Sequence, residues 1–377
     1  MTDFKRLGDI ATYINGYAFK PEDRGNEGLP IIRIQDLTGN SYDLGFYNGE
    51  YPERIEINDG DVLISWSGSL GVYLWNKGKA LLNQHIFKVV FDKAEIDKSY
   101  FIYAIQHHLK EMEAKTHGAT MKHITKKDFD NMLVPYPNIQ KQREIAGILS
   151  TVDRIIASCQ LELTKLDELV KSRFVEMFGD PIQNPMAWQN GVLASICKKI
   201  TDGEHGSVPR VDAGVIFLNA KHVKKDGSID WTTVTYISNE VHNKIYARCN
   251  PEPGDILLTT TGTIGNVAIV PDIAPFSMDR GITLLKPDGG RVNNRYLASL
   301  LNFDCIQTIM NANVHASAIG HLFLNKVMQI PIIVPPLDKQ EKFAAFVEQT
   351  DKSKFVVQQS LEKVETLKKS LMQQYFG

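Results

Sequence analysis

Cysteines and long apolar runs are scarce in this chain of 377 residues. The four cysteines, Cys159, Cys197, Cys249 and Cys305, lie far apart and form no Cys-x-x-Cys pair. They suit a reducing cytoplasm and argue against a disulfide framework or a structural zinc site. No apolar run reaches the roughly 18 residues needed to span a bilayer, and the N-terminal MTDFKRLGDI lacks the pattern of a signal peptide. We therefore expect a cytoplasmic protein without a membrane partner.

An excess of either charge is also missing, because the formal net charge is −2. This value argues against a polycation that coats nucleic acid nonspecifically, but it leaves room for a locally basic face. The contents of hydrophobic residues (43%) and charged residues (23%) are those of an ordinary globular protein. The length favours two or three domains with substantial cores.

Catalytic motifs are the third absence. The stretch GDILLTTTGTIG (254–265) suggests a phosphate-binding turn, but it lacks the lysine of a P-loop. The Pro335-Pro336 pair has neither the preceding Asn or Asp nor the following aromatic residue of a DNA methyltransferase motif. No H-E-x-x-H helix, G-x-S-x-G turn or metal-spaced His/Cys cluster is present. We predict no catalytic residue and no metal ligand, so the sequence favours binding over turnover.

What the sequence does contain is an internal repeat. The stretch GDVLISWSGSLG (60–71) matches GDILLTTTGTIG (254–265) at an offset of 194 residues. The stretch KQREIAGILSTVD (141–153) matches KQEKFAAFVEQTD (339–351) at an offset of 198. The offset starts at 186 near Leu7 and Leu193, rises through the globular parts, and stays constant after Lys141. The globular parts therefore differ in their loops, whereas the segment after each has a fixed length.

Each fixed-length segment predicts a long helix with a heptad seam. In the first copy the seam consists of Ile145, Leu149, Val152, Ile156, Cys159, Leu163, Leu166 and Val170. In the second copy Phe343, Val347, Val357, Leu361, Val364 and Leu371 fit the seam, whereas Thr350, Lys354 and Lys368 do not. A single exposed heptad helix is unstable alone, so we expect the two helices to pair. If a twofold relates the copies, the pair is antiparallel and holds the globular parts at opposite ends.

These patterns divide the chain into globular domains at 1–138 and 180–336 and helices at 139–179 and 337–377. Proline-marked segments, VPYPNIQKQ (134–142) and VPPLDKQ (334–340), join each domain to its helix. Short β-branched runs such as DVLISW and DILLTTT accompany one helical stretch in each domain, SYFIYAIQHHLKEME and NRYLASLLNFDCIQTIM. The mixture predicts α/β or α+β domains around a twisted sheet.

Two variable globular units, each followed by a fixed-length heptad helix, resemble the specificity (S) subunit of type I restriction–modification enzymes. The resemblance covers essentially the whole chain. Its marks are TDGEH (201–205), the doubled glycine turn, NQHIFKV (83–89) with its counterpart DRGITLLKP (279–287), and the Pro-x-x-x-Lys-Gln joints. The first unit departs from the pattern, because it has INGYAFK where the second has TDGEH.

The resemblance implies that each domain is a target recognition domain that reads half of a split sequence in double-stranded DNA. It implies that the paired helices act as a ruler and as a platform for two methyltransferase (M) subunits. S-adenosylmethionine would belong to those subunits, and ATP with Mg to a separate restriction and translocase (R) subunit. The S subunit itself would be non-catalytic and hold no cofactor. Because the two domains differ, we expect an asymmetric target.

Candidate DNA contacts are residues that can meet base edges or phosphates: Arg, Lys, Gln, His and short polar side chains. In the first unit they are Arg33, Gln35, Ser65, Trp66, Ser67, Ser69, Gln84, His85, Lys122 and His123. In the second unit they are His205, Arg210, Lys221, His222, Thr259, Thr260, Thr261, Thr263, Arg280, His315 and His321. For the serines and threonines, hydroxyls that cap turn amides are an equally good interpretation.

Two other functional classes compete with this interpretation. A coiled-coil adaptor with protein-binding globular ends would show the same helices. A self-sufficient methyltransferase or nuclease is disfavoured by the missing motifs. The residues do not reveal the DNA target or the length of its spacer.

Overall fold

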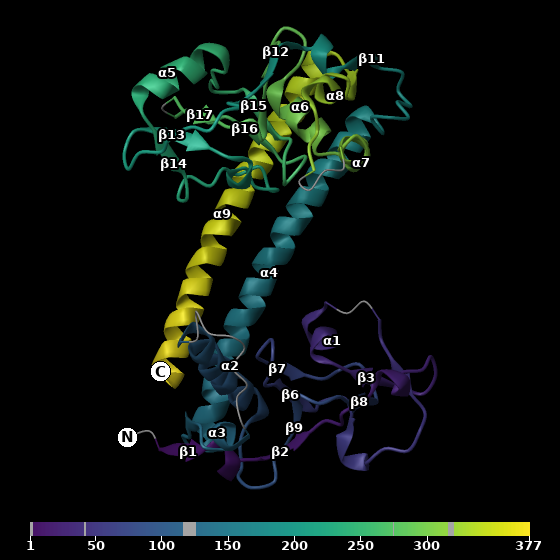
Figure 1. The fold of residues 1–377 in the computed structure, drawn as a ribbon, viewed down its shortest axis with the longest axis vertical. Coiled ribbons are helices and arrows are strands. Elements are labelled where there is room, and N and C mark those ends of the chain that lie inside the picture. Colours follow the sequence, from purple (N-terminus) through teal and green to yellow (C-terminus); the bar gives the residue numbers. More distant parts are fainter. Residues whose placement is uncertain (1–2, 41–42, 116–125, 274, 316–319) are drawn as a thin grey trace. The chain divides into compact units, whose positions relative to one another are not determined.

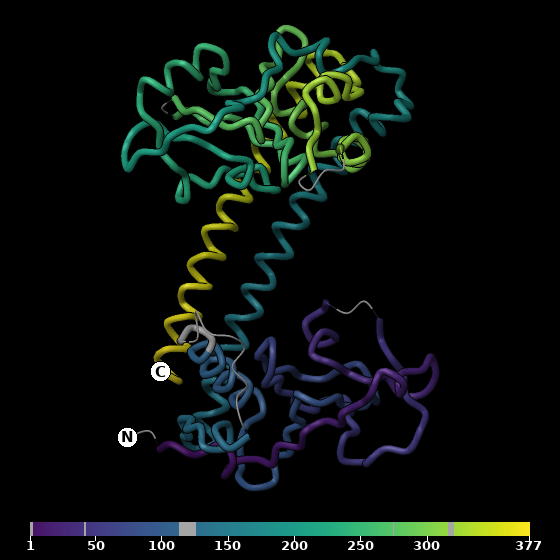
Figure 2. Tube along the Cα trace, viewed as in Figure 1, coloured from purple at the N-terminus to yellow at the C-terminus, as the bar shows by residue number. Residues whose placement is uncertain are grey.

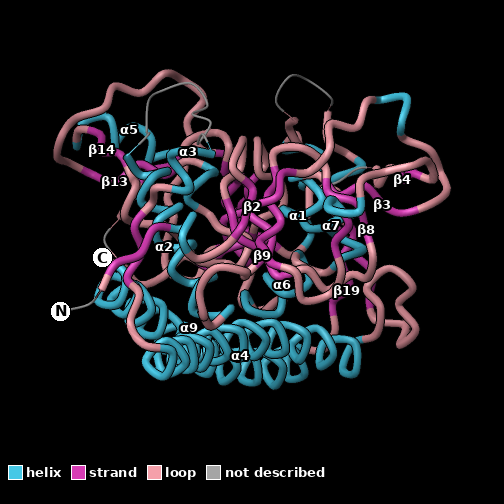
Figure 3. Tube along the Cα trace, turned by 90° about the horizontal axis from the view of Figure 1, so that it is seen from below, coloured by secondary structure: helices cyan, strands magenta, loops and turns pink. Residues whose placement is uncertain are grey.

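The computed structural model describes residues 3–40, 43–115, 126–273, 275–315 and 320–377. Contacts divide the chain into two compact units. Unit 1 comprises Met1–Gln160 with Gln359–Gly377, and unit 2 comprises Leu161–Gln358. Each unit mixes strands and helices (Figure 3) and includes part of both long helices. Within the described ranges, no helix is long and apolar enough to cross a membrane.

The globular part of unit 1 contains two four-stranded sheets. Figure 1 labels β2, β6, β7 and β9 of one sheet and β3 and β8 of the other. The first has the antiparallel order β2 (Thr12–Asn15), β9 (Ile86–Val90), β6 (Val62–Ser65) and β7 (Gly71–Leu74). The second has the order β4 (Phe46–Tyr47), β3 (Leu29–Ile32), β8 (Ala80–Leu82) and β5 (Glu56–Ile57). Strands β3 and β8 are parallel, so they end side by side at Ile32 and Leu82.

The core of unit 1 is aromatic beneath the first sheet. The ring centroid of Phe129 lies 4.8 Å from that of Tyr13 and 5.6 Å from that of Phe87. The helices of this domain are α1 (Ile34–Thr38), α2 (Lys98–Lys115) and α3 (Lys126–Asp130). Strand β10 (Leu133–Pro135) pairs antiparallel with β1 (Phe4–Arg6) immediately before the long helix begins.

Unit 2 repeats this plan. One sheet has the order β12 (Cys197–Asp202), β18 (Ile282–Pro287), β15 (Ile256–Thr259) and β16 (Val267–Ile269), all antiparallel. The other has the order β14 (Thr235–Ile237), β13 (Val215–Leu218) and β17 (Ser277–Met278). Strands β13 and β17 are parallel, as β3 and β8 are in unit 1. Strand β19 (Pro331–Val334) pairs with β11 (Gln189–Val192) before the second long helix.

The sequence predicts a single helix in each globular domain, and this is wrong for both units, because unit 1 has α1 and α3 beside α2 and unit 2 has α5 to α8. The stretch NRYLASLLNFDCIQTIM forms α6 (Asn294–Leu301) and α7 (Asp304–Ala312), because the backbone is extended at Phe303, with φ −71° and ψ 139°. Helices α5 (Asn239–Arg248) and α8 (Leu324–Met328) are further elements of unit 2. Helix α5 lies where the offset between the copies rises from 186 at Arg33 and Asn219 to 194 at Gly60 and Gly254, so it accommodates much of the extra length.

The fixed-length segments form α4 (Ile139–Phe178) and α9 (Leu337–Phe376), as their heptad spacing predicts (Figure 2). In unit 1, the first part of α4 packs against the end of α9, where Leu149 shares a core with Phe376. In unit 2, the end of α4 packs against the first part of α9, where Phe174 and Phe178 each lie 5.5 Å from Phe343. Each unit therefore contains an antiparallel helix pair.

The predicted seam residues of both helices are buried or half-buried. The expectation that Thr350, Lys354 and Lys368 interrupt the seam of α9 is wrong. Thr350 is buried and donates its hydroxyl to the carbonyl of Phe346. Lys354 pairs with Asp167 in unit 2, and Lys368 pairs with Asp153 at 2.6 Å in unit 1. The seam continues through these positions because a lysine stem covers apolar surface while its ammonium reaches a carboxylate.

Candidate nucleic-acid interface

The doubled glycine–aspartate motif forms the same turn in both units. The Asp61 carboxylate accepts from the main-chain N–H of Asn58, and the Asp255 carboxylate accepts from that of Glu252, both at 2.8 Å. The preceding Gly60 has φ +89° and Gly254 has φ +90°, which is the left-handed region that favours glycine. The motif is therefore a structural turn that leads into the buried strands β6 and β15.

Three tripeptides of unit 2 line a concave surface that we call corner 2. They are Asn219–Lys221 after β13, Thr261–Thr263 after β15, and Asp279–Gly281 between β17 and β18. Four residues that the sequence predicts as DNA contacts lie in this corner: Lys221, Thr261, Thr263 and Arg280. The first two tripeptides are brought together although about 40 residues separate them in the chain.

Main-chain hydrogen bonds hold corner 2 together. The N–H of Asp279 donates to the carbonyl of Leu218 at 3.0 Å, and the N–H of Arg280 donates to that of Glu204 at 2.9 Å. The N–H of Thr260 donates to the carbonyl of Gly281 at 2.8 Å. Four segments are thus joined through backbone atoms, and these links do not involve the exposed side chains of Lys221, Thr263 and Arg280.

The side chains of corner 2 can bind an anion or a polar edge. Lys221, Thr263 and Arg280 are exposed, and the Asn219 amide donates to the Asp279 carboxylate. Two cations, a hydroxyl, and an amide bonded to a carboxylate therefore surround one hollow. This combination matches phosphate oxygens and the donors and acceptors on base edges.

Three predicted histidines belong to the surroundings of corner 2. The Nδ1 atom of His321 lies 2.6 Å from the Thr261 hydroxyl, and its ring lies 4.8 Å from that of Phe323. Burial, assisted by the positive charge of Arg280, holds the pKa of His321 below its ordinary value. The main-chain N–H of His315 donates to the carbonyl of His321 at 2.9 Å. The exposed His205 ring lies 2.7 Å from the Asp202 carboxylate.

Unit 1 contains the same frame, which we call corner 1: Arg33–Gln35, Ser67–Ser69 and Asn83–His85. The N–H of Asn83 donates to the carbonyl of Ile32 at 3.0 Å, as Asp279 does to Leu218. The N–H of Trp66 donates to the carbonyl of His85 at 3.2 Å, as Thr260 does to Gly281. The candidate residues predicted in the first unit, apart from Ser65, Trp66, Lys122 and His123, therefore lie at the positions of corner 1.

The sequence difference between INGYAFK and TDGEH leaves this frame intact. Tyr17 forms a parallel bridge with Asn83, as Glu204 does with Asp279. A Cβ atom on Gly16 would lie 2.0 Å from the carbonyl oxygen of Asn83. The same atom on Gly203 would lie 2.2 Å from that of Asp279. Only the glycine is required for this close approach, so the neighbouring residues can differ between the units.

Four candidates have a structural role instead, because their side chains are fully buried: Ser65, His222, Thr259 and Thr260. Ser67 of corner 1 is also buried, with a relative exposure of 8%. The Ser65 hydroxyl donates to the carbonyl of Ser69 at 2.6 Å. The Thr259 hydroxyl accepts from the N–H of Asn266 at 2.9 Å, and that of Thr260 donates to the carbonyl of Gly281 at 3.3 Å. These contacts correspond to hydroxyls that cap the turn, so we assign these side chains to the frame.

The remaining candidates are more varied. The Arg33 side chain is mostly buried and pairs with Asp36 at 3.2 Å. The half-buried Trp66 ring stacks on Phe87, with centroids 5.6 Å apart. The exposed Arg210 guanidinium lies 4.2 Å from the ring centroid of Phe217, outside the lining of corner 2. Lys122 and His123 lie outside the described residues.

Two polar side chains of corner 2 are missing from the sequence prediction, namely those of Asn219 and Asp279. Asn219 stands before the short 3-10 turn Ala220–His222 and donates its main-chain N–H to the His222 ring at 2.8 Å, as Arg33 before α1 donates its own to the Asp36 carboxylate at 2.7 Å. An Asn three residues before a His, directly after an apolar strand, is the signal that could have identified this turn.

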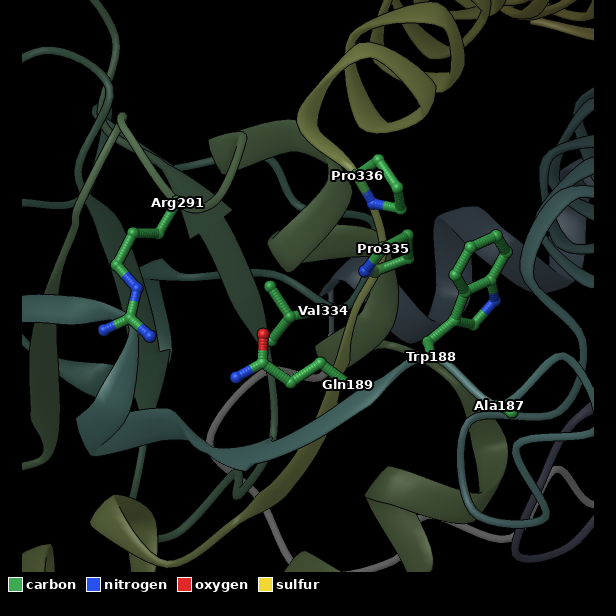
Figure 4. A pocket seen from close by; sticks show the side chains of 7 residues that line it. All are labelled: Ala187, Trp188, Gln189, Arg291, Val334, Pro335 and Pro336. Carbon is green, nitrogen blue, oxygen red and sulfur yellow. The ribbon is translucent and has the colours of Figure 1, made fainter.

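A second hollow in unit 2 lies where the domain meets α9 (Figure 4). Pro335 and Pro336 stand between Trp188 on one side and Arg291 on the other. The Lys339 ammonium lies 5.0 Å from the Trp188 ring centroid. None of the predicted DNA contacts lines this hollow, so we treat it as part of the joint between domain and helix.

Two copies of one α+β domain, each with the same polar corner and each packed on a long helix pair, define a tandem-domain protein with two related surfaces. The model of the type I restriction modification DNA specificity domain matches residues 2–168 and 206–366. The chain therefore belongs to this family and carries its domain twice, which confirms the resemblance seen in the sequence. Membership makes it a DNA-specificity protein and disfavours the adaptor interpretation.

Individual relatives agree. The specificity subunit of the type I restriction enzyme EcoBI from Escherichia coli is 24% identical over 98% of this chain and 84% of its own length. The MjaVIII specificity subunit of Methanocaldococcus jannaschii is 23% identical over 97% of this chain and 90% of its own. The structure of a type I S subunit from M. genitalium has a TM-score of 0.59 at 16% identity, covering 100% of this chain and 96% of the other.

Proposed function

We propose that this chain reads a bipartite DNA sequence, with unit 1 contacting one half and unit 2 the other. The long helices would set the number of unread base pairs between the halves. One observation carries the proposal: two corners with the same main-chain frame gather the polar residues that suit DNA contact. Family membership supports the same conclusion.

The two corners present different side chains on this frame, which supports an asymmetric target. The equivalent pairs are Arg33 and Asn219, Gln35 and Lys221, Ser67 and Thr261, Ser69 and Thr263, Gln84 and Arg280, and His85 and Gly281. At one of these positions corner 1 has a glutamine, Gln84, where corner 2 has an arginine, Arg280. Glutamine bonds adenine through two hydrogen bonds, and arginine bonds guanine in the same way. The corners therefore favour different bases.

The helices would also serve as the docking platform for two methyltransferase subunits. In unit 2, α4 and α9 expose Leu161, Leu169 and Phe355, with relative exposures of 55%, 48% and 62%. Large apolar side chains on an exposed helical surface suit a protein partner. S-adenosylmethionine would then reside on those partners, and ATP with Mg on a restriction subunit. This chain would contribute recognition without catalysis, in the cytoplasm.

The test uses the complex assembled with its methyltransferase partner and a library of randomised duplexes. We expect Arg280→Ala to lower discrimination at one base pair of one half-site by about 5- to 150-fold, since a bidentate contact is worth roughly 1–3 kcal/mol. The other half-site should be read as before. The control is Lys198→Ala, which removes an exposed cation of β12 outside corner 2.

Three results would contradict the proposal. The first is loss of discrimination in both half-sites with Arg280→Ala, since the corners would then not read independently. The second is an equal loss with Lys198→Ala. The third is a wild-type complex without sequence-selective, salt-dependent duplex binding, which would favour the coiled-coil adaptor.

A further inference from the structure

A buried glutamine bonds the second domain to its helix. The Gln340 side chain, near the start of α9, is fully buried. Its Oε1 accepts from the main-chain N–H of Asn293 at 2.8 Å. Its Nε2 donates to the carbonyl of Pro335 at 2.8 Å and to that of Arg291 at 3.2 Å. One side chain thus connects the helix, the strand that leads into it and the start of α6.

The same arrangement occurs in unit 1. Gln142, near the start of α4, accepts from the N–H of Asp97 at 3.0 Å and donates to the carbonyl of Pro137 at 2.8 Å. Its side chain is also buried, at 1% exposure. Asp97 and Asn293 each cap the helix that follows, α2 in unit 1 and α6 in unit 2. Two of the three hydrogen bonds of Gln340 are therefore repeated by Gln142.

A buried tyrosine adds a second bond to each joint. The Tyr100 hydroxyl of α2 donates to the carbonyl of Pro135 at 2.9 Å, and the Tyr296 hydroxyl of α6 donates to that of Ile333 at 3.0 Å. Both acceptors lie on the strand that runs into the long helix. Both tyrosines are fully buried, so their bonds are formed away from water.

A third attachment lies farther along each long helix. Asp153 of α4 accepts from the Tyr103 hydroxyl at 2.8 Å, and Asp351 of α9 accepts from the Arg295 guanidinium at 2.9 Å. Each carboxylate lies about three helical turns, roughly 16 Å, beyond the glutamine of its own helix. Two separated attachments constrain the direction of a helix as well as its position.

The buried hydrogen bonds of each joint restrict the angle between the domain and its long helix. An apolar contact tolerates sliding, whereas a buried hydrogen bond that loses its geometry leaves an unsatisfied donor or acceptor. The two buried attachments, together with the half-exposed carboxylate bond farther along the helix, therefore favour one angle between each domain and the helix pair on which it packs. A domain held at another angle would present its corner to the DNA in another place.

We propose that Gln142 and Gln340, together with Tyr100 and Tyr296, are positioning residues that set the spacer length at which both half-sites are read. This inference rests on the proposed function. The residues touch no DNA in this scheme. They act through the angle at which each corner is held.

The test is a binding selection with the methyltransferase complex, using duplexes in which both half-sites are fixed and the spacer length varies. The wild-type complex should prefer one length. The double variant Gln340→Met, Tyr296→Phe keeps the volume of the joint but removes its hydrogen bonds. We expect preference for the best spacer over lengths one base pair shorter or longer to fall about tenfold, with each half-site consensus unchanged. Tyr296→Phe alone should lower the spacer preference by a smaller factor. Because it removes only one hydroxyl, it still tests the inference if the double variant does not fold.

The matched control is Tyr13→Phe. Tyr13 is a buried tyrosine of unit 1 whose hydroxyl donates to the carbonyl of Leu7 at 3.1 Å, inside the domain rather than at its joint. Tyr13→Phe should lower the free energy of unfolding about as much as Tyr296→Phe does and leave the spacer preference unchanged. The inference is overturned if the joint variants keep the wild-type spacer preference, or if Tyr13→Phe relaxes it equally. A wild-type complex without any selective binding overturns the proposed function itself.

Discussion

Lys221 and His222 are neighbours with opposite environments, because a 3-10 turn directs one outward and the other inward. The Nδ1 atom of His222 accepts from the main-chain N–H of Asn219 at 2.8 Å, and its Nε2 lies 3.2 Å from the carbonyl of Thr233. A neutral ring with its proton on Nε2 satisfies both partners. His222 thus supports the turn that presents Lys221.

This arrangement predicts a pH-dependent stability. Burial holds the pKa of His222 below its ordinary value, and burial does the same to His242. The unfolded chain therefore takes up the proton first as the pH falls. Stability is fully present above about pH 6.5 and is lost below it, by up to about 1.4 kcal/mol per pH unit for each histidine.

The measurement is urea denaturation of the full chain at pH 7.5 and 5.5. We expect His222→Gln to lose less unfolding free energy between these values than the wild type, with the remainder due in part to His242. An equal loss in both proteins would contradict the assignment to His222.

At the scale of elements, the helices and strands with a regular sequence period could be predicted, whereas the roles of residues in turns could not. The heptad spacing of residues 139–179 predicts α4, and buried runs such as DVLISW predict strands, because each pattern repeats along the element. Turns have no such period, so Thr259 and Thr260 could not be separated from Thr261 and Thr263 in the sequence. The place of Lys354 and Lys368 in the seam could not be predicted either, because their acidic partners lie on the other helix.

Those lysines predict a charge-swap result. Lys354→Glu places a carboxylate near Asp167 and should destabilise the folded chain by about 1 kcal/mol, because exposed or half-exposed pairs contribute only modestly. Adding Asp167→Lys should restore most of that loss through the reversed pair. Thermal or urea unfolding of the two single variants and the double variant measures the coupling. A double variant as unstable as the sum of the two singles would show that the pair does not act in the folded state.

For the molecule as a whole, the repeat was the most informative signal, since it predicted that two surfaces of one kind exist. It did not predict which residues meet there. Arg33 and Gln84 belong to one corner only because the parallel strands β3 and β8 end side by side, and long-range pairing of that kind leaves no local signature. The joints were marked by proline, but the bonds of Gln142 and Gln340 require the fold to be known.

The ruler role predicts a change in spacer. Seven residues inserted into both helices, after Gln160 and after Gln358, preserve the seam and lengthen each helix by about 10 Å. The preferred spacer should increase by roughly three base pairs at 3.4 Å each, with both half-sites unchanged. Binding should also weaken, since three base pairs turn the second half-site by about 100° around the duplex. A selection that returns the original spacer would count against the ruler.

The main-chain hydrogen bonds that hold the corners together have an evolutionary consequence. The bonds from Asp279 to Leu218 and from Thr260 to Gly281 use main-chain atoms, so the exposed side chains beside them contribute little to folding. If these corners bind DNA as proposed, single substitutions at Lys221, Thr263 or Arg280 would alter what is bound while the domain stays folded. A lineage under pressure to change its DNA target could do so through these exposed positions with little loss of stability. Repeated changes of this kind would produce the differences between corner 1 and corner 2.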